Sequence, residues 1–180
     1  MSRIISVFGS SGPQPKSDAY EVARKTGQLL AEAGFTVQTG GYAGVMAGVS
    51  QGANEAGGHV IGITSAKIES FRAFPPNQWI IEEIKYQTLQ ERLLHLVNQC
   101  DGCIVLPGGI GTLSELSLIW SLVQVEEIEP LPIITVGEMW QRTLAAFITT
   151  EYVRPSYQAL INIVNTPEEA VKIITADIAT

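Results

Sequence analysis

The sequence predicts an α/β fold: a single domain built on a doubly wound, mainly parallel sheet with helices on both faces. Three observations support this prediction. Short runs rich in β-branched residues alternate with segments whose apolar residues recur at helical spacing. The β-rich runs are continuous in Val and Ile, which is typical of strands buried on both faces. The length of 180 residues suits one domain over 1–180 and is too short for a closed barrel of eight units.

Predicted strands and helices follow one another along the chain. The strands are Ile4–Phe8, Phe35–Thr39, His59–Thr64, Cys103–Leu106, Leu131–Val136 and Ile161–Val164. The helices are Ser17–Ala33, Gly44–Ala56, Thr88–Gln99, Thr112–Val125, Met139–Thr149 and Pro167–Ala176. Repeated strand–helix–strand units favour parallel pairing through right-handed crossovers. The stretch Lys67–Gln87 does not follow this alternation of strands and helices, and we expect it to be an excursion over the sheet edge.

Charge and composition exclude several partners and locations. The chain has 11 basic and 18 acidic side chains, a formal net charge of −7, and 46% apolar residues. An acidic chain without clustered Lys and Arg disfavours binding to nucleic acid or to an anionic membrane surface. No apolar stretch reaches the roughly 18 residues that span a membrane, and the first residues do not read as a signal peptide. We therefore expect a cytoplasmic protein.

The cysteines and histidines are interpreted as structural. Cys100 and Cys103 have C-x-x-C spacing, but Cys100 ends a predicted helix instead of beginning one, so we expect two buried, inert thiols. His59 is interpreted as a packed strand residue and His95 as a helix-face residue. Because neither has acidic or Cys neighbours at ligand spacing, no metal site is predicted.

Three predicted strands end in turns rich in glycine. The first glycine turn is residues 9–12 (GSSG), the second is residues 40–44 (GGYAG) and the third is residues 107–112 (PGGIGT). Ligands of parallel sheets bind at the carboxyl ends of the strands. A glycine turn that leads into a helix exposes N–H groups at the positive end of the helix dipole, which suits an anion. Glycine also simply permits tight turns, but three such turns at one sheet edge favour an anion site. None of them is a Walker A loop.

Two charged residues near the third glycine turn have both a structural and a functional interpretation. Glu115 fits a capping box with Thr112, but it also lies with apolar residues beside the turn, where a buried carboxylate can act as a base. No Lys or Arg occurs between Leu93 and Gln141, so a cation for this turn must come from elsewhere. The upstream candidate is Arg92, at the border of an apolar helix stripe, where a solvated side chain is the usual state.

These residues resemble the Lonely Guy (LOG) family, whose members were once labelled lysine decarboxylases. Residues 107–115 match the family signature P-G-G-x-G-T-x-x-E, and Arg92 matches the arginine of its M-x-x-R-K signature, in which Leu89 and Leu93 replace the Met and the Lys. The resemblance runs from the first glycine turn to about Phe147 and implies a Rossmann-like nucleotide-binding domain. The decarboxylase label fits poorly, because the five lysines lie outside the glycine turns and a pyridoxal enzyme needs a Schiff-base lysine.

The resemblance implies hydrolysis of the N-glycosidic bond of a purine nucleoside 5′-monophosphate, N6-modified ones included, to free base and ribose 5-phosphate. It implies no metal and no cofactor. Arg92 and Glu115 would be catalytic, with Glu115 stabilising an oxocarbenium-like state or activating water. The implied nucleotide-binding residues are Gly9, Ser10, Ser11, Gly40, Gly41, Gly44, Met46, Pro107, Gly108, Gly109, Gly111 and Thr112.

Other interpretations stay open. The same sheet edge can hold a nucleotide or a phosphorylated pterin without catalysis, as in the LOG-like molybdenum cofactor carrier proteins, since a fold does not decide function. The chain can also be a relative that has lost its ligand. LOG family members are typically dimers, and the predicted helix Thr112–Val125 is apolar nearly all round, so we expect a homodimer.

Overall fold

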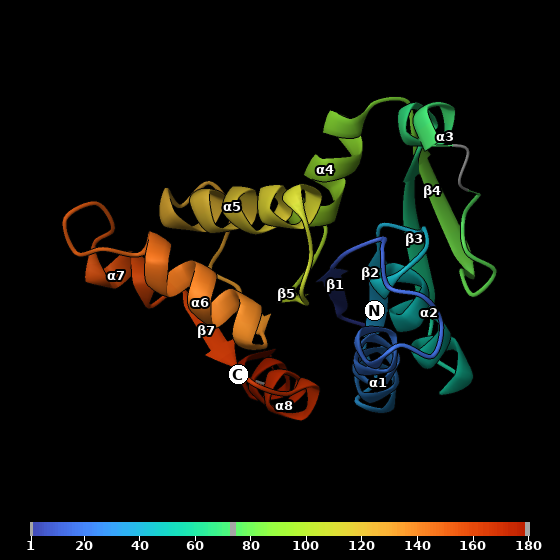
Figure 1. Ribbon diagram of the computed structural model, residues 1–180, viewed down its shortest axis with the longest axis horizontal. Helices are drawn as coiled ribbons and strands as arrows, with labels where there is room; N and C mark the ends of the chain where they lie inside the picture. Colours follow the sequence, from blue (N-terminus) through green and yellow to red (C-terminus); the bar gives the residue numbers. More distant parts are fainter. Residues whose placement is uncertain (1, 73–74, 179–180) are drawn as a thin grey trace.

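A single parallel sheet runs through the part of the protein that the computed structural model describes, residues 2–72 and 75–178 (Figure 1). Its strand order is β4-β3-β2-β1-β5-β6-β7. The strands are β1 (Ile4–Phe8), β2 (Thr36–Thr39), β3 (Val60–Ser65), β4 (Glu82–Tyr86), β5 (Gly102–Val105), β6 (Ile133–Val136) and β7 (Ile161–Val164). All six neighbouring pairs are parallel, so the predicted α/β fold is confirmed.

Helices cover both faces of this sheet. The helices are α1 (Asp18–Glu32), α2 (Val45–Glu55), α3 (Ala66–Arg72), α4 (Leu89–Asn98), α5 (Ile110–Gln124), α6 (Glu138–Phe147), α7 (Pro155–Gln158) and α8 (Pro167–Ile178). One hydrophobic cluster joins the sheet to α1, α2 and α8, and a second joins it to α4, α5 and α6. In Figure 1, α4 and α5 accordingly lie on the side of the strands opposite α1 and α8.

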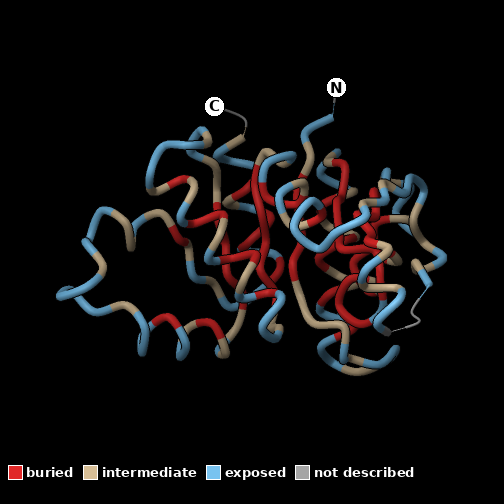
Figure 2. Tube along the Cα trace, turned by 90° about the horizontal axis from the view of Figure 1, so that it is seen from above, coloured by how far each residue is buried: buried red, intermediate tan, exposed pale blue. Residues whose placement is uncertain are grey.

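The central strands are buried on both faces. Along β1, Ile5 and Val7 belong to the first cluster and Phe8 belongs to the second, so successive side chains enter opposite layers. All residues of β2, β3, β5 and β6 are buried as well. Figure 2 shows this buried trace at the centre of the molecule, with the exposed trace around it. The continuous runs of Val and Ile therefore belong to strands that are buried on both faces, as predicted.

The strand order reverses between β1 and β5. The chain adds β2, β3 and β4 on one side of β1, and it then returns to add β5, β6 and β7 on the other side. Such a reversal leaves a crevice outside the carboxyl ends of the two central strands, where open α/β sheets bind their ligands. The first and third glycine turns follow β1 and β5, so both flank this point.

Residues 67–87 are the main correction to the predicted fold. This stretch is not an excursion over the sheet edge, because it contributes most of α3 and the edge strand β4, which pairs with β3 from Ile61↔Glu82 to Ser65↔Tyr86. The strand reads EEIKY, and its first two residues are exposed. An edge strand has one neighbour and carries charge, so it lacks the continuous apolar run of a central strand.

None of the helices in residues 2–72 and 75–178 combines the length and apolar character that crossing a bilayer requires.

Candidate functional site

The three glycine turns meet at the carboxyl edge of the sheet. The Ser10 amide donates to the carbonyl of Pro107 at 3.3 Å, which joins the first turn to the third. The Ser10 carbonyl accepts from the amide of Val45 at 2.8 Å, which joins the first turn to the start of α2 and so to the second turn. The structure thus brings together the turns that the sequence predicted at one edge.

Glycine is required where these turns pack most closely. Gly44 has a φ of +70°, and a Cβ on it would collide with the main chain at Ser10 and Ser11. A Cβ on Gly40 would collide with the Arg92 guanidinium and the sulfur of Met46. The second turn therefore lets the main chain approach Arg92 directly.

The third glycine turn opens onto free space. Helix α5 begins at Ile110, its N-cap is Gly109, and no side chain caps it. The first amides of a helix have no partner within the helix, so those of this turn are available to a ligand. A Cβ built on Gly109 or on Gly111 would meet nothing within 4 Å. Packing in the described structure therefore does not require glycine at either position, and both leave the main chain open to close approach by an anion.

Thr112 completes this turn. Its side chain is buried, and a Cβ on Gly108 would collide with it. Within the described part of the chain, the Thr112 hydroxyl makes no hydrogen bond to another residue. No other described residue therefore occupies its proton.

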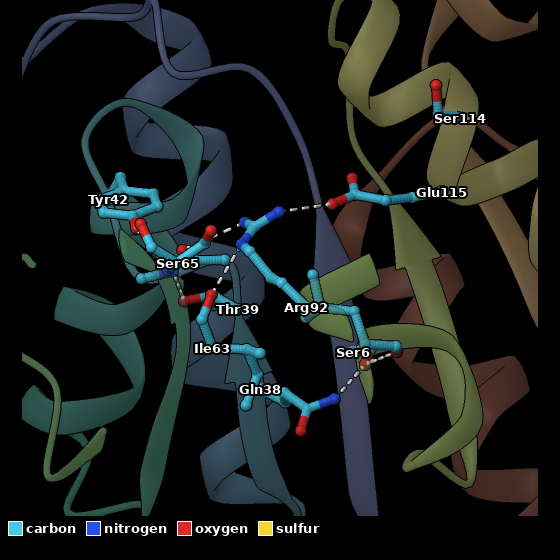
Figure 3. Close-up of polar contacts among 12 residues, drawn as sticks. Ser6, Gln38, Thr39, Tyr42, Ile63, Ser65, Arg92, Ser114 and Glu115 are labelled. Atoms are coloured by element: carbon cyan, nitrogen blue, oxygen red, sulfur yellow. Dashed lines mark hydrogen bonds and ion pairs between the residues drawn. The ribbon is translucent and has the colours of Figure 1, made fainter. Parts of the chain in front are cut away.

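Glu115 does not cap helix α5. The helix begins two residues earlier than predicted, so Glu115 falls in its second turn, and the capping-box interpretation is wrong. The residue is 8% exposed, and its Oε1 lies 3.7 Å from Nη1 of Arg92 (Figure 3). Burial raises the pKa of Glu115 to about 7, and the Arg92 charge opposes the rise. The carboxyl group therefore exchanges its proton near neutral pH.

Arg92 is buried rather than solvated, so the predicted solvated state is wrong. It is 6% exposed; Nε donates to the Ile63 carbonyl at 2.8 Å, and Nη2 donates to the Gly40 carbonyl at 3.1 Å. Burial lowers the pKa of Arg92, while Glu115 and Tyr42 oppose the decrease. Two main-chain carbonyls and one carboxylate compensate for the desolvation of the guanidinium, which sequence periodicity cannot reveal.

Tyr42 and Asn77 belong to the surroundings of the site, although sequence reasoning did not single out either as a site residue. The Tyr42 ring lies 5.8 Å from the Arg92 guanidinium carbon, and its hydroxyl bonds to the main-chain N–H and carbonyl of Ser65. The Asn77 amide N–H donates to the Gly41 carbonyl, and its side chain donates to the Tyr42 carbonyl. Asn77 lies outside every recognisable motif, so no sequence signal pointed to it.

The remaining singled-out residues lie away from this edge or inside the protein. Cys103 is buried as predicted, whereas Cys100 is partly exposed. Burial raises the pKa of Cys100 to about 11 and that of Cys103 well above its usual value, which supports the interpretation of both as inert thiols. His59 precedes β3 and bonds to Glu82 near the surface, so its interpretation as a packed strand residue is wrong. Among the described residues, no group of three His, Cys, Asp or Glu could hold a metal ion.

The fold and the site define a Rossmann-like α/β protein in which a helix N-terminus with free amides lies beside a buried Arg–Glu pair. Residues 46–174 match the family model described as "Possible lysine decarboxylase". The chain therefore belongs to this family, which is the LOG family that its signature residues resemble.

The chain is similar in sequence to curated proteins that are named as phosphoribohydrolases. The chain is 30% identical over 155 residues to the probable cytokinin riboside 5′-monophosphate phosphoribohydrolase LOGL5 of Oryza sativa subsp. japonica, a match that covers 79% of this chain and 58% of the relative. It is 31% identical over 118 residues to the cytokinin riboside 5′-monophosphate phosphoribohydrolase of Mycobacterium tuberculosis, covering 65% of this chain and 62% of the relative. The chain thus spans about three fifths of the length of these two relatives.

A solved structure with a different named role shares this fold. The molybdenum cofactor binding protein of Rippkaea orientalis superposes with a TM-score of 0.77 at 26% identity, covering 99% of this chain and 98% of that one. The family thus includes hydrolase-named relatives, and the fold is shared with a cofactor-binding protein.

Proposed function

We propose that this protein hydrolyses the N-glycosidic bond of purine nucleoside 5′-monophosphates, N6-modified ones included, through one nucleotide-binding domain. Water adds to C1′ of the ribose, the bond from C1′ to the base nitrogen breaks, and the base leaves with a proton. The products are a free base and ribose 5-phosphate. The observation that carries the proposal is the buried Glu115 on α5, the helix that follows the third glycine turn; it lies 3.7 Å from Arg92, and burial raises its pKa to about 7.

The third glycine turn would hold the 5′-phosphate. The main-chain amides of Gly108, Gly109, Gly111 and Thr112 and the Thr112 hydroxyl are the proposed donors. A dianion at a helix N-terminus interacts favourably with the helix dipole. This explains how a chain with a net charge of −7 can bind a mononucleotide: the donors are main-chain groups rather than surface lysines. The bound phosphate would then orient the ribose toward Glu115.

Glu115 would act directly at the ribose, and Arg92 would act through Glu115. Hydrolysis passes through a state with positive charge at C1′, and an ionised carboxylate nearby stabilises that charge or activates the attacking water. Arg92 favours the ionised form of Glu115. Because Nε and Nη2 of Arg92 already donate to main-chain carbonyls, we assign it to orienting Glu115 rather than to holding the phosphate.

A nucleotide panel tests the proposal. Purified protein is incubated with AMP, GMP, pyrimidine monophosphates and N6-modified AMP, and free base is measured by chromatography. Release of base from a purine monophosphate, and none from the matching nucleoside without phosphate, is the expected result. No release from any of them would contradict the proposal for these substrates.

Non-catalytic binding of a nucleotide or a phosphorylated pterin is the second candidate, favoured by the likeness to the molybdenum cofactor binding protein. The pairing of Arg92 with Glu115 supports the hydrolase instead, because a carrier does not need a proton-exchanging carboxyl group. In the same panel, a rise in melting temperature with ligand and no product would favour the carrier.

We further propose that the protein acts as a homodimer in the cytoplasm. Ile110 and Leu113 of α5 and Phe147 and Tyr152 near the end of α6 are exposed apolar side chains. Leu113, Phe147 and Tyr152 line a groove of about 480 Å³ between α5, α6 and the segment around α7. A second copy would cover this apolar face. Both cysteines are free thiols, as is usual in a reducing compartment.

A further inference from the structure

A chain of polar side chains crosses the interior next to the candidate site. The Tyr86 hydroxyl lies 2.8 Å from Nδ1 of His95, and Nε2 of His95 lies 3.1 Å from Oε1 of Gln38. Nε2 of Gln38 lies 2.8 Å from the Ser6 hydroxyl, which lies 2.8 Å from the Leu96 carbonyl. Ser6 and Gln38 are fully buried, and Figure 3 shows them below Arg92. Four hydrogen bonds thus connect β4, α4, β2 and β1.

The donor and the acceptor of every hydrogen bond in this series follow from the Leu96 carbonyl at its end. The Leu96 carbonyl can only accept, so the Ser6 hydroxyl uses its single proton there and must accept from Gln38. The amide nitrogen of Gln38 therefore faces Ser6, and its oxygen must accept from His95. This requires a proton on Nε2 of His95. Nδ1 is left as an acceptor for Tyr86, so neutral His95 has one allowed tautomer.

His95 occupies the same helix face as Arg92. The two residues are three positions apart on α4, so their side chains are neighbours along one side of the helix. Arg92 reaches the main chain of Ile63 and Gly40 and the carboxylate of Glu115. His95 reaches β2 and β4 from the next turn. The two side chains thus fasten one face of α4 to the sheet.

We propose that His95 is a positioning residue: as the neutral Nε2–H tautomer, it holds α4 against the sheet so that Arg92 remains beside Glu115. Burial of the imidazole, which lowers the pKa of His95, accords with a neutral ring. The catalytic consequence rests on the proposed hydrolase function, whereas the tautomer and the placement of Arg92 do not.

Nitrogen-15 NMR of the full chain tests the tautomer. The chain has two histidines, so His59→Phe removes the other imidazole and assigns the signals. At pH 7.5 we expect His95 to show a protonated Nε2 and an unprotonated Nδ1. A protonated Nδ1, or a rapidly exchanging mixture of tautomers, would overturn the proposed bond directions.

The positioning role is tested by His95→Phe and His95→Gln. His95→Phe removes both hydrogen bonds, whereas the Gln amide can still donate to Gln38. We expect the Arg92 Nε–H signal, assigned with Arg92→Lys, to be protected from exchange in the wild-type protein, in His95→Gln and in the surface control His59→Phe, and to lose protection in His95→Phe. Unchanged protection in His95→Phe would contradict the role. Should His95→Phe fail to fold, Tyr86→Phe, which deletes one hydroxyl, must weaken the same protection.

Turnover provides the second readout. We expect kcat to fall about tenfold in His95→Phe with KM changed less than twofold, and to recover to within about threefold of wild type in His95→Gln. Equal kcat in the wild type and His95→Phe would contradict positioning of a catalytic group. If the wild-type protein releases no base, the proposed function fails, and the Arg92 signal alone decides the positioning role.

Discussion

Nη1 of Arg92 lies 3.7 Å from Oε1 of Glu115, and both side chains are almost completely removed from water. This distance is longer than a hydrogen bond, so the contact is one of charge rather than of a shared proton. The guanidinium donates instead to the Ile63 and Gly40 carbonyls, which hold it in this orientation. Arg92 therefore limits the rise in the pKa of Glu115 that burial causes, and the lone pairs of the carboxylate remain available to a ligand or a water molecule.

Replacing Glu115 by Gln should abolish chemistry and preserve binding. The amide has the same shape but can neither take a proton nor stabilise positive charge, so we expect kcat to fall by a factor of about 100 or more. Glu127→Gln makes the same chemical change at an exposed position and should leave kcat unchanged. Free base is measured by chromatography, and AMP binding is measured by thermal shift. Full turnover in Glu115→Gln would remove this residue from the mechanism.

The raised pKa of Glu115 makes the stability of the protein depend on pH. The pKa rises from 4.5 to about 7 on folding, so between these values the folded chain binds the proton more tightly than the unfolded chain. This contribution to stability is fully present below pH 4.5 and is lost as the pH rises through 7. We expect Glu115→Gln to gain about 2.5 kcal/mol of unfolding free energy over wild type between pH 5 and pH 8.5. Urea unfolding at both pH values measures the difference, and an equal difference at both would contradict the assignment.

Two neighbouring glycines should separate ligand binding from folding. Gly109→Ala places a methyl group in open space, so the melting temperature should stay within about 2 °C of wild type while the methyl group obstructs phosphate and weakens AMP binding at least tenfold. Gly108→Ala collides with Thr112 and should destabilise the fold by about 1–3 kcal/mol. Calorimetric titration with AMP and thermal unfolding provide the two readouts. Undiminished AMP affinity in Gly109→Ala would argue against phosphate on this turn.

Removing the Arg92 charge should lower the free energy of unfolding. Arg92→Met removes the donors that Arg92 supplies to the Gly40 and Ile63 carbonyls and removes the charge beside Glu115, so we expect a loss of about 3 kcal/mol in unfolding free energy. The pKa of Glu115 should rise further, because the charge that opposes the rise is gone. Arg142→Met removes an exposed partner of Glu138 and should change stability by less than about 0.5 kcal/mol. Urea unfolding compares the two variants, and a similar small loss in both would show that Arg92 is dispensable.

The apolar face on α5 and α6 predicts a homodimer in solution. Light scattering after size exclusion should give about twice the mass of the 19.4 kDa chain. Phe147→Glu places a charge on the exposed face and should give the mass of one chain with an unchanged circular dichroism spectrum. Val22→Glu is the matched control, because Val22 is an exposed apolar residue on α1. A wild-type mass of one chain would contradict the dimer.

Most of the fold follows from local pattern. The predicted strands β1 and β7 have the observed bounds, and each of the six predicted helices has an observed counterpart. Edge strand β4 was missed because its charged side chains conceal it, and the short helices α3 and α7 were missed as well. The start of α5 was misplaced by two residues because Gly109, which caps it, has no side chain to signal a cap.

The sequence by itself determined the order of the elements, the three glycine turns at one sheet edge and the two charged residues of interest. Only the tertiary structure decided what those residues do. Arg92 and Glu115 lie on different helices, and the return of the chain across β1 to β5 brings them together on one face of the sheet. Burial then changes their chemistry, because a charge away from water must find partners or shift its pKa, and those partners come from distant parts of the chain.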